Sequence, residues 1–281
     1  GYCYYGDRHL STSLLFGCCP PVRSLMDWKL SVVLFFIGGA IGGSFLNVVI
    51  YRLPQRLSLI HPRSHCTHCK AKIPFYRNIP LVSFILQIGK CKECNRKISP
   101  QYPLVELITG VVWSWCFLNL EGTVAVLTVL LFSTLITIAW IDGLTMNIPL
   151  KLIFFVLGVE IVGCLLGDIS LRKALGGAFI GVICLGLIML LTFLLTKRQG
   201  MGFGDLQLGL VLGIWLGSVN MALTLFGASF ISLLVWLGIS ARKGLNKNRA
   251  LPFAPFLIFS AGLVFVIDFY LGAGIIQFFF S

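Results

Sequence analysis

Charged residues are scarce in this sequence, and acidic residues are scarcer than basic ones. The 281 residues include 10 Asp and Glu against 22 Lys and Arg, and charged residues make up 11% of the chain. A soluble domain has about 25% charged residues, so this composition excludes an ordinary soluble domain. With 57% hydrophobic residues and a mean hydropathy of +0.94, we expect an all-α polytopic membrane protein.

The sequence also lacks a glycine-rich nucleotide-binding loop, a basic helix and a nucleic-acid-binding motif. The net charge of +12 therefore does not indicate nucleic acid as a partner. Basic residues beside membrane helices attract anionic lipids and set the orientation of the chain. We expect anionic membrane lipids, and no nucleic acid, among the partners.

Several apolar segments are long enough, or nearly so, to cross a bilayer as helices, which takes about 20 residues. The boundary between the sixth and seventh of these segments depends only on the turn Gly217-Ser218-Val219-Asn220. We expect about eight transmembrane helices, at residues 30–51, 104–120, 123–142, 149–166, 174–195, 206–219, 220–239 and 252–280.

Basic residues concentrate in loops that would share one side of the membrane. The longest loop, residues 52–103, is rich in Lys and Arg, and Lys151 falls on the same side if the helices alternate. The other side receives Lys29, Arg172 and Lys173. Because Lys and Arg are retained in the cytoplasm, we predict that loop 52–103 is cytoplasmic.

Residues 1–25 differ from the rest of the sequence. They have no clear apolar period and include Cys18-Cys19-Pro20-Pro21, whereas Met26 leads directly into the first apolar segment. We expect Met26 to be the natural start, and residues 1–25 to be a non-native or unstructured extension.

The loop contains two Cys-x-x-Cys pairs. Cys66 and Cys69 form the first pair, and Cys91 and Cys94 form the second after 21 intervening residues. Four thiolates in two such pairs suit a tetrahedral structural zinc ion. Disulfides are the alternative, which a reducing cytoplasm disfavours. Histidines close to the first pair, of which His68 lies between its cysteines, are either substitute ligands or solvated bystanders.

Two aspartates end or begin apolar segments at the predicted cytoplasmic face. Asp142 ends Ala139-Trp140-Ile141-Asp142, and Asp205 ends Gly202-Phe203-Gly204-Asp205. A charge in the hydrocarbon region costs about 2.5 kcal/mol or more, so a pair at matching depth suggests an aspartyl hydrolase within the membrane. Two close carboxylates share a proton, so one can activate water while the other polarises a carbonyl.

Each aspartate taken alone has a simpler interpretation as a hydrated helix cap, and Gly-x-Gly-Asp alone is a weak pattern. We expect Gly202 and Gly204 to allow unusual backbone conformations, and to allow a substrate to approach closely before Asp205. Glu160 and Asp268 match no motif, and we expect them to pair with polar groups or to lie near the far interface.

Three polar residues near the loop leave two interpretations open. Glu106 either benefits from the dipole at a helix N-terminus or lies at a functional site. Asn47 could bond a neighbouring helix, and Arg52 could extend to the interface. Glycines such as Gly39 and Gly43 favour close packing of the first helix, which we expect to position the zinc loop.

Six motifs together resemble one family. They are Gly43-Ser44-Phe45-Leu46-Asn47, Tyr76-Arg77-Asn78-Ile79-Pro80, Ile98-Ser99-Pro100-Gln101-Tyr102-Pro103, Asp142, Gly202-Phe203-Gly204-Asp205 and Leu251-Pro252-Phe253-Ala254-Pro255-Phe256. With the cysteine pairs, they resemble the type IV prepilin peptidases, which are bifunctional leader peptidase/N-methyltransferases of bacterial pilus, type II secretion and competence systems. The resemblance covers about residues 32–258.

The resemblance implies cleavage of a short basic leader after a glycine, at the cytoplasmic face of the bacterial inner membrane. It also implies methylation of the new N-terminal residue, usually phenylalanine, with S-adenosylmethionine as donor. Asp142 and Asp205 match the two catalytic aspartates, and Glu106 is a possible cofactor-binding residue. Gln207 replaces a frequent lysine and Ala254 a frequent glycine, but neither change removes a catalytic carboxylate.

On this basis the chain divides into two parts after the extension. Residues 26–103 hold the first helix and the zinc loop, and residues 104–281 form the transmembrane peptidase domain.

Two alternative functions remain. One is a Gly-x-Gly-Asp membrane peptidase without methyltransferase activity, which would lack the four-cysteine loop. The other is a non-enzymatic zinc-binding transporter or scaffold, which inverted repeats would favour. The sequence does not distinguish between pilins and pseudopilins as substrates.

Overall fold

The computed structural model describes residues 25–61, 64–66, 68–74, 78–197, 202–244 and 251–271. Within these residues the regular structure is helical, and β-pairing is limited to two isolated bridges, His65–Lys72 and Lys90–Lys97. The all-α prediction is therefore confirmed for the described chain. The extension expected at residues 1–25 lies outside it except for Leu25, which begins the first helix.

A helix forms in each of the eight apolar segments. These helices are α1 (Leu25–Arg52), α3 (Gln101–Asn119), α4 (Gly122–Thr145), α5 (Leu150–Leu166), α6 (Leu171–Thr196), α7 (Phe203–Leu216), α8 (Ser218–Lys243) and α9 (Ala254–Leu271). Five of them, α1, α4, α6, α8 and α9, are long and apolar enough to cross a membrane by length and composition. A short helix that the sequence did not predict, α2 (Val82–Leu86), lies in the cysteine loop.

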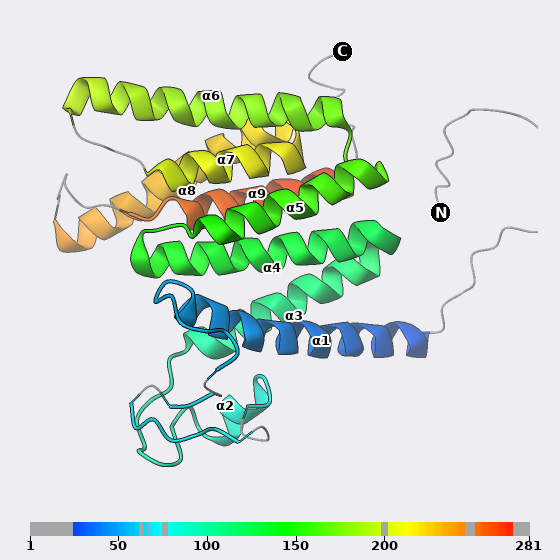
Figure 1. The fold of residues 1–281 in the computed structure, drawn as a ribbon, viewed down its shortest axis with the longest axis vertical. Coiled ribbons are helices and arrows are strands. Elements are labelled where there is room, and N and C mark those ends of the chain that lie inside the picture. Colours follow the sequence, from blue (N-terminus) through cyan, green and yellow to red (C-terminus); the bar gives the residue numbers. More distant parts are fainter. Residues whose placement is uncertain are drawn as a thin grey trace, which may run out of the picture.

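The long helices lie side by side and alternate in direction (Figure 1). The C-terminal ends of α4, α6 and α8 gather with the N-terminal ends of α5, α7 and α9 at the left of the view. We call this the basic end, because Arg52, Lys197 and Lys243 lie at the helix ends there. Arg172 and Lys173 lie at the start of α6, at the opposite end.

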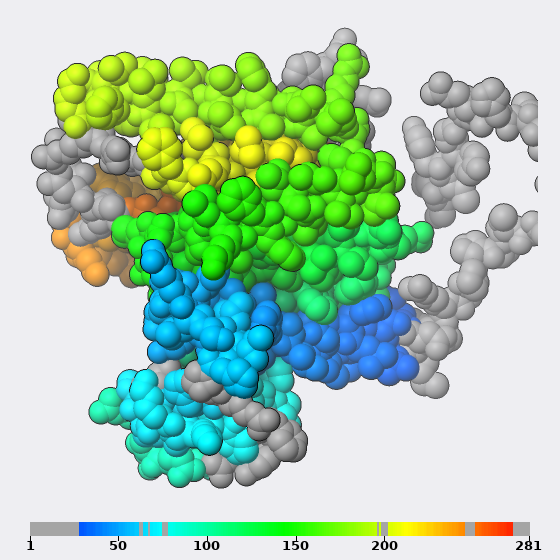
Figure 2. Space-filling model, in the orientation of Figure 1, coloured from blue at the N-terminus to red at the C-terminus, as the bar shows by residue number. Residues whose placement is uncertain are grey.

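Helix α4 forms the centre of the bundle. Leu135 and Ile138 are fully buried and pack in one cluster with residues of α5, α7 and α9, such as Val156, Val211 and Leu257. In contrast, only 11% of the apolar window of α6 is buried, against 56% for α4. Figure 2 shows α6 along one edge of the molecule and the cysteine loop protruding from the opposite edge. The exposed apolar surface of α6 suits contact with lipid.

Glycines bring two pairs of helices into backbone contact. A Cβ at Gly39 or Gly43 of α1 would approach backbone atoms of α3 at 2.7 Å. A Cβ at Gly213 of α7 would clash with the backbone of Gly177 in α6. Close packing of the first helix is therefore confirmed. Helices α6 and α7 also approach each other closely at glycines, and the sequence analysis missed this contact.

Candidate active site and metal-binding lobe

Asp142 is held at the C-terminal end of α4. The helix ends at Met146, a left-handed residue whose N–H donates to the carbonyl of Asp142 (2.8 Å). The carboxylate itself is 5% exposed, and its Oδ2 accepts the backbone N–H of Ala254 (3.3 Å), the first residue of α9. Asp142 thus connects the end of α4 to the start of α9.

Asp205 lies in the first turn of α7, directly after the glycines. The prediction of an unusual backbone is wrong for Gly202, because its φ of −79° is open to any residue. The prediction that substrate approaches closely here stays a prediction, but Gly204 has a packing role, since a Cβ there would lie 3.0 Å from Cβ of Ile148 in the loop between α4 and α5. Glycine at position 204 therefore lets the start of α7 pack against that loop.

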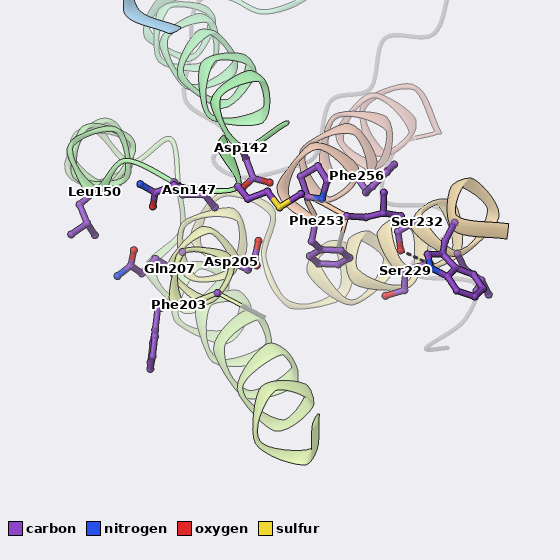
Figure 3. Close-up of a pocket in the computed structure, with 18 residues that line it drawn as sticks. Asp142, Asn147, Leu150, Phe203, Asp205, Gln207, Ser229, Ser232, Phe253 and Phe256 are labelled. Carbon is purple, nitrogen blue, oxygen red and sulfur yellow. Dashed lines mark hydrogen bonds between the residues drawn. The ribbon is translucent and has the colours of Figure 1, made fainter. Parts of the chain in front are cut away.

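Both aspartates line one cavity of about 980 Å³ at the basic end. In Figure 3 their side chains lie in the middle of the group of lining residues, and the charge of Asp142 acts on Asp205. The other lining residues are Met146, Asn147, Ile148, Leu150, Gly202, Phe203, Gly204, Gln207, Ser229, Ser232, Leu233, Trp236, Leu251, Pro252, Phe253 and Phe256.

This arrangement can perform acid–base chemistry on a bound peptide. Two carboxylates that line the same half-enclosed cavity do not both ionise readily when they are close, so this arrangement suits a pair that shares one proton. A cavity of this size is at the upper end of the range for small-molecule sites, and it has room for several residues of an extended chain. The sequence correctly predicted that the two aspartates lie at the same end of the bundle. It did not predict the contact between Asp142 and Ala254, because these residues are 112 positions apart and no local sequence pattern indicates the contact.

The four loop cysteines converge in space. Their sulfur atoms all lie within 4.8 Å of one another, and Sγ of Cys66 is 3.9 Å from Sγ of Cys94. Tetrahedral zinc with Zn–S bonds of about 2.3 Å requires sulfurs about 3.8 Å apart. None of the four forms a disulfide, so this group fits one zinc ion.

The two cysteine pairs share one backbone design. In each, the N–H of the first cysteine donates to the carbonyl five residues later, Ala71 or Arg96 (2.9 Å in both). The residue four positions after it, Lys70 or Asn95, has a left-handed φ of 58° or 55°. The sequence analysis did not identify this internal repeat, although its signal was present in the parallel runs Cys66-Thr67-His68-Cys69-Lys70 and Cys91-Lys92-Glu93-Cys94-Asn95.

Electrostatics acts in opposite directions on the two cysteines of the first pair. At Cys69 a backbone hydrogen bond at Ala71 lowers the pKa, but desolvation and hydrogen bonds with the other thiols outweigh it and raise the pKa to about 11. A backbone hydrogen bond from Cys69 lowers the pKa of the Cys66 thiol to about 7, which increases the thiolate fraction that a metal requires. His68 is not among the converging ligands. Instead its Nδ1 accepts a hydrogen bond from Nη1 of Arg96 (3.0 Å), which links the two cysteine pairs.

Polar residues of α1 and α3 attach the loop to the bundle. Oε2 of Glu106, which is 7% exposed, accepts the backbone N–H of Leu81 at the start of α2 (2.8 Å). Nδ2 of Asn47 donates to the carbonyl of Tyr102 (3.0 Å), so its predicted bond to a neighbouring helix is confirmed. Arg52 is 6% exposed and donates to the carbonyl of Ser58 (2.9 Å), and its extension to the interface stays a prediction.

Two further acids lie away from the cavity. Asp268 accepts a hydrogen bond from Nδ2 of Asn220 (3.1 Å), which confirms its predicted polar partner. Glu160 is 1% exposed, and neither of its carboxyl oxygens has a hydrogen-bond partner among the described residues. Of the two predicted alternatives for Glu160, a polar partner is therefore not found among the described residues, whereas a place near the far interface stays a prediction.

Comparison with known proteins identifies the family. The profile described as Bacterial Peptidase A24 N-terminal domain matches residues 37–120, and the profile of the Type IV leader peptidase family matches residues 129–239. The two profiles divide the chain between α3 and α4, whereas our division at residues 103 and 104 stays a prediction.

Curated proteins that are similar to this chain have names that agree with this family profile. A prepilin leader peptidase/N-methyltransferase of Dichelobacter nodosus is 32% identical over 276 residues, covering 87% of this chain and 94% of the relative. A protein of the same name from Neisseria gonorrhoeae is 33% identical, covering 84% of this chain and 90% of the relative. No solved structure matches this chain. The chain belongs to the type IV leader peptidase family.

Proposed function

We propose that this chain cleaves the basic leader of type IV prepilins or pseudopilins and N-methylates the new N-terminal residue. The observation that carries this proposal is the cavity in which Asp142 of α4 and Asp205 of α7 meet at the basic end. The family assignment supports the proposal, because relatives in this family are named as both leader peptidases and N-methyltransferases. Asp142 and Asp205 are the proposed catalytic residues.

The proposed cleavage needs no covalent intermediate. The ionised member of the pair takes a proton from water, whose oxygen attacks the carbonyl carbon of the glycine before the scissile bond. The protonated member donates a hydrogen bond to the carbonyl oxygen, and a proton then passes to the departing amine as the C–N bond breaks. The N–H of Ala254 fixes Oδ2 of Asp142, which leaves the other oxygen free for water.

The cysteine loop is proposed to hold one structural zinc ion on Cys66, Cys69, Cys91 and Cys94. The convergence of the four sulfurs supports this, and four thiolates complete a closed tetrahedral site with no position for a substrate. Such an ion would fix the two cysteine pairs relative to each other and so shape the lobe.

We also propose that all eight long helices cross the bacterial inner membrane, with the basic end in the cytoplasm. The alternation of the helices and the basic residues at one end support this orientation. Anionic lipid headgroups would then surround the basic end. The leader, whose charge is also positive, would meet both the headgroups and the cavity at the same face.

S-adenosylmethionine is the proposed methyl donor and would supply an electrophilic methyl group to the uncharged amine. A role for Glu106 in binding it stays a prediction. Its Oε2 accepts the N–H of Leu81, and Ser44 also hydrogen-bonds its side chain. These contacts support a structural role for Glu106, so we assign no residue to the donor.

A mass measurement tests both activities together. Purified protein in lipid or detergent would be incubated with a prepilin, with and without S-adenosylmethionine. We expect loss of the leader in both samples, and an added methyl mass only with the donor. Cleavage without methylation would identify a peptidase alone, and an intact prepilin in both samples would contradict the proposed function.

A further inference from the structure

The cysteine lobe carries an exposed apolar surface next to its four cysteines. This surface consists of α2 and the residues on either side of it, and its large aliphatic side chains are between 47% and 83% exposed: Ile79, Val82, Ile85, Leu86 and Ile88. We call these five residues the α2 patch. Residues 78–89, which contain the patch, include no charged residue. A contiguous exposed apolar surface of this kind marks contact with a partner or a membrane.

The inward side of the same segment is already packed. Ser83 is buried, and Phe84 packs against Gly89, where a Cβ would lie 3.0 Å from its ring. The N–H groups of Ile85, Gln87 and Gly89 each donate to a carbonyl four or five residues earlier, at 2.9–3.1 Å. The segment therefore satisfies these backbone groups by itself, which is what an apolar environment requires.

The contact with α3 holds the patch beside the bundle and not beyond its end. The N–H of Leu81, directly before α2, donates to Oε2 of Glu106, and a Cβ on Gly43 of α1 would lie 2.7 Å from Cα of Glu106. Gly43 precedes Arg52, the last residue of α1, by nine residues, which is about 14 Å along the helix. Figure 1 shows α2 level with the body of α1. The patch therefore lies at the depth of the membrane boundary if α1 spans the bilayer.

The rest of the lobe is basic. Residues 52–103 contain ten Lys and Arg but only one acid, Glu93. The exposed basic side chains of the described lobe include Lys70, Lys72, Lys90, Lys92, Arg96 and Lys97. An apolar face bordered by basic residues is typical of segments that lie in the membrane interface, where anionic headgroups attract the basic residues. Charge and depth together therefore favour lipid over a soluble partner.

We propose that the cysteine lobe docks on the bilayer, with the α2 patch at the boundary between headgroups and acyl chains and the basic residues of the lobe on anionic headgroups. Lipid and Glu106 then hold the lobe from two sides. The proposal rests on the proposed placement of the bundle in the membrane, with the basic end in the cytoplasm. It requires neither cleavage nor methylation.

Photocrosslinking to lipid tests the docking. The full-length protein, with p-benzoylphenylalanine in place of Ile85, would be reconstituted in nanodiscs of phosphatidylcholine and phosphatidylglycerol and irradiated, and lipid adducts would be measured by mass spectrometry. Two further probe sites serve as references. Leu187 is an exposed residue of the lipid-facing helix α6, and Asn95 is an exposed polar residue in the turn of the second cysteine pair.

Lipid capture at Ile85 should resemble capture at Leu187. Because removal of a large aliphatic side chain from water favours the apolar position about 10-fold or more, we expect capture at Ile85 to exceed capture at Asn95 by about 10-fold. Nanodiscs of phosphatidylcholine alone should give less capture at Ile85, since the basic residues then lose their anionic partners.

A charge within the patch should release it from the bilayer. Ile85→Asp should lower lipid capture by a probe at Ile88 by about 10-fold, because an unpaired charge is unfavourable in the apolar part of the membrane. Asn95→Asp adds the same charge outside the patch and should leave this capture unchanged. Ile85→Ser would be measured if the melting temperature shows that Ile85→Asp does not fold, and it should change capture in the same direction.

The reference sites separate failure of the docking from failure of the membrane placement. Lipid capture at Leu187 with no more capture at Ile85 than at Asn95 would overturn the docking alone. A crosslink from Ile85 to a second copy of the chain would overturn it in favour of self-association, and equal capture in the two lipid mixtures would overturn the role of anionic headgroups. If Leu187 captures no lipid, the membrane placement fails and the docking fails with it. Prepilin cleavage enters none of these measurements.

Discussion

Asp142 and Asp205 both meet the N-terminus of a helix, although they lie on different helices. Asp205 is in the first turn of α7, and Asp142 accepts the first N–H of α9. Helix N-termini favour a negative charge, so both dipoles would help to retain a negative charge on these acids beside an apolar bundle. Among the described residues that line the cavity there is no basic side chain, so the helix N-termini are the favourable partners that the described chain offers.

The first prediction concerns the two carboxylates. Asp142→Asn and Asp205→Asn should each lower the rate of leader cleavage by at least about 100-fold, because the amide keeps the shape but cannot share a proton, and acid–base catalysis contributes about 10²-fold to 10⁴-fold. The measurement is cleavage of a prepilin by each purified variant.

Asp268→Asn is the matched control. Asp268 also lies on an apolar helix, but it bonds to Asn220 and is not among the residues that line the cavity. This variant should cleave at nearly the normal rate. Near-normal cleavage by either cavity variant would reject the catalytic assignment.

At the residue scale, the sequence could identify the two aspartates because each lies in a recognisable motif at the edge of an apolar segment. It could not reveal that Ala254 binds Asp142, since that contact depends on how α4 and α9 pack. The sequence analysis also expected an unusual backbone conformation at Gly202, which the structure does not have. Glycine allows such a conformation, but the residue type alone does not determine the backbone angle.

At the scale of helices, α6 and α7 meet through two Gly-x-x-x-Gly patterns. Gly177 and Gly181 on α6 face Gly213 and Gly209 on α7, and a Cβ at any of the four would clash with the facing helix. This pattern allows backbones to approach closely within membranes. Because Asp205 is in the first turn of α7, the contact between the helices also sets the place of a proposed catalytic residue.

The second prediction follows from this contact. Gly213→Ala should lower the melting temperature in detergent and reduce cleavage, because its Cβ meets backbone atoms that cannot move independently of α6. Overpacking of this kind costs about 1–3 kcal/mol. Gly158→Ala in α5 is the control, since a Cβ there meets nothing within 4 Å. Equal melting temperatures for the two variants would show that the close approach is not required.

The third prediction concerns the attachment of the cysteine lobe. Glu106→Ala would leave the N–H of Leu81 without its acceptor, at a residue whose φ of 61° is already unfavourable for leucine. The loss of a partly buried hydrogen bond costs about 1–3 kcal/mol. We expect faster hydrogen exchange at Val82–Leu86 in this variant.

Glu106→Gln tests the same contact with less disturbance, because the amide oxygen can still accept the N–H of Leu81. Exchange at Val82–Leu86 should therefore remain near that of the unmodified protein. If the alanine and glutamine variants exchange at the same rate, Glu106 does not anchor the lobe through this bond.

The sequence predicted the helices well because each depends on a long apolar run. It missed α2, because a helix of five residues has no measurable periodicity and this one is held by contacts with Glu106. It noted the glycines of α1 but not those of α6 and α7, although the spacing is the same. The sequence could not show which helix packs against which, because a glycine pattern on one helix does not specify its partner.

At the scale of the whole molecule, the cysteine lobe and the cavity that contains the two aspartates lie toward the same end of the bundle but on different elements. The lobe is attached through α1 and α3, whereas the cavity is formed by residues of α4, α7, α8 and α9 and by the loops between them. The sequence could place both at one face from the distribution of basic residues. It also expected the first helix to position the lobe, but it could not show that α3 holds the lobe as well.

The fourth prediction concerns metal content. Protein purified under reducing conditions should contain about one equivalent of zinc, because the four sulfurs fit one tetrahedral site. The double variant Cys66→Ser/Cys91→Ser removes one ligand from each pair and should lose the metal, as measured by elemental analysis. A protein without metal and with intact disulfides would contradict both the zinc site and the cytoplasmic location of the loop.

The last prediction separates the two activities, because the two regions lie on different helices. Asp205→Asn should still methylate a synthetic pilin segment that begins at the mature N-terminus, since methyl transfer needs an uncharged amine and no activated water. Radiolabelled methyl incorporation into this segment is the measurement. Cys66→Ser/Cys91→Ser should lose at least as much methylation as cleavage, because a polar, charged donor is better accommodated by the lobe than by the lipid phase.

A loss of methylation in Asp205→Asn is informative only if the variant is folded. Asp205→Asn and the unmodified protein should therefore have the same melting temperature and zinc content before the methylation assay is interpreted. If a folded Asp205→Asn protein incorporates no methyl group, the cavity serves both reactions, and the lobe does not form a separate methylation site. If the cysteine variant methylates normally but does not cleave, the lobe instead supports the cavity, and the attachment through Glu106 would be the route by which it does so.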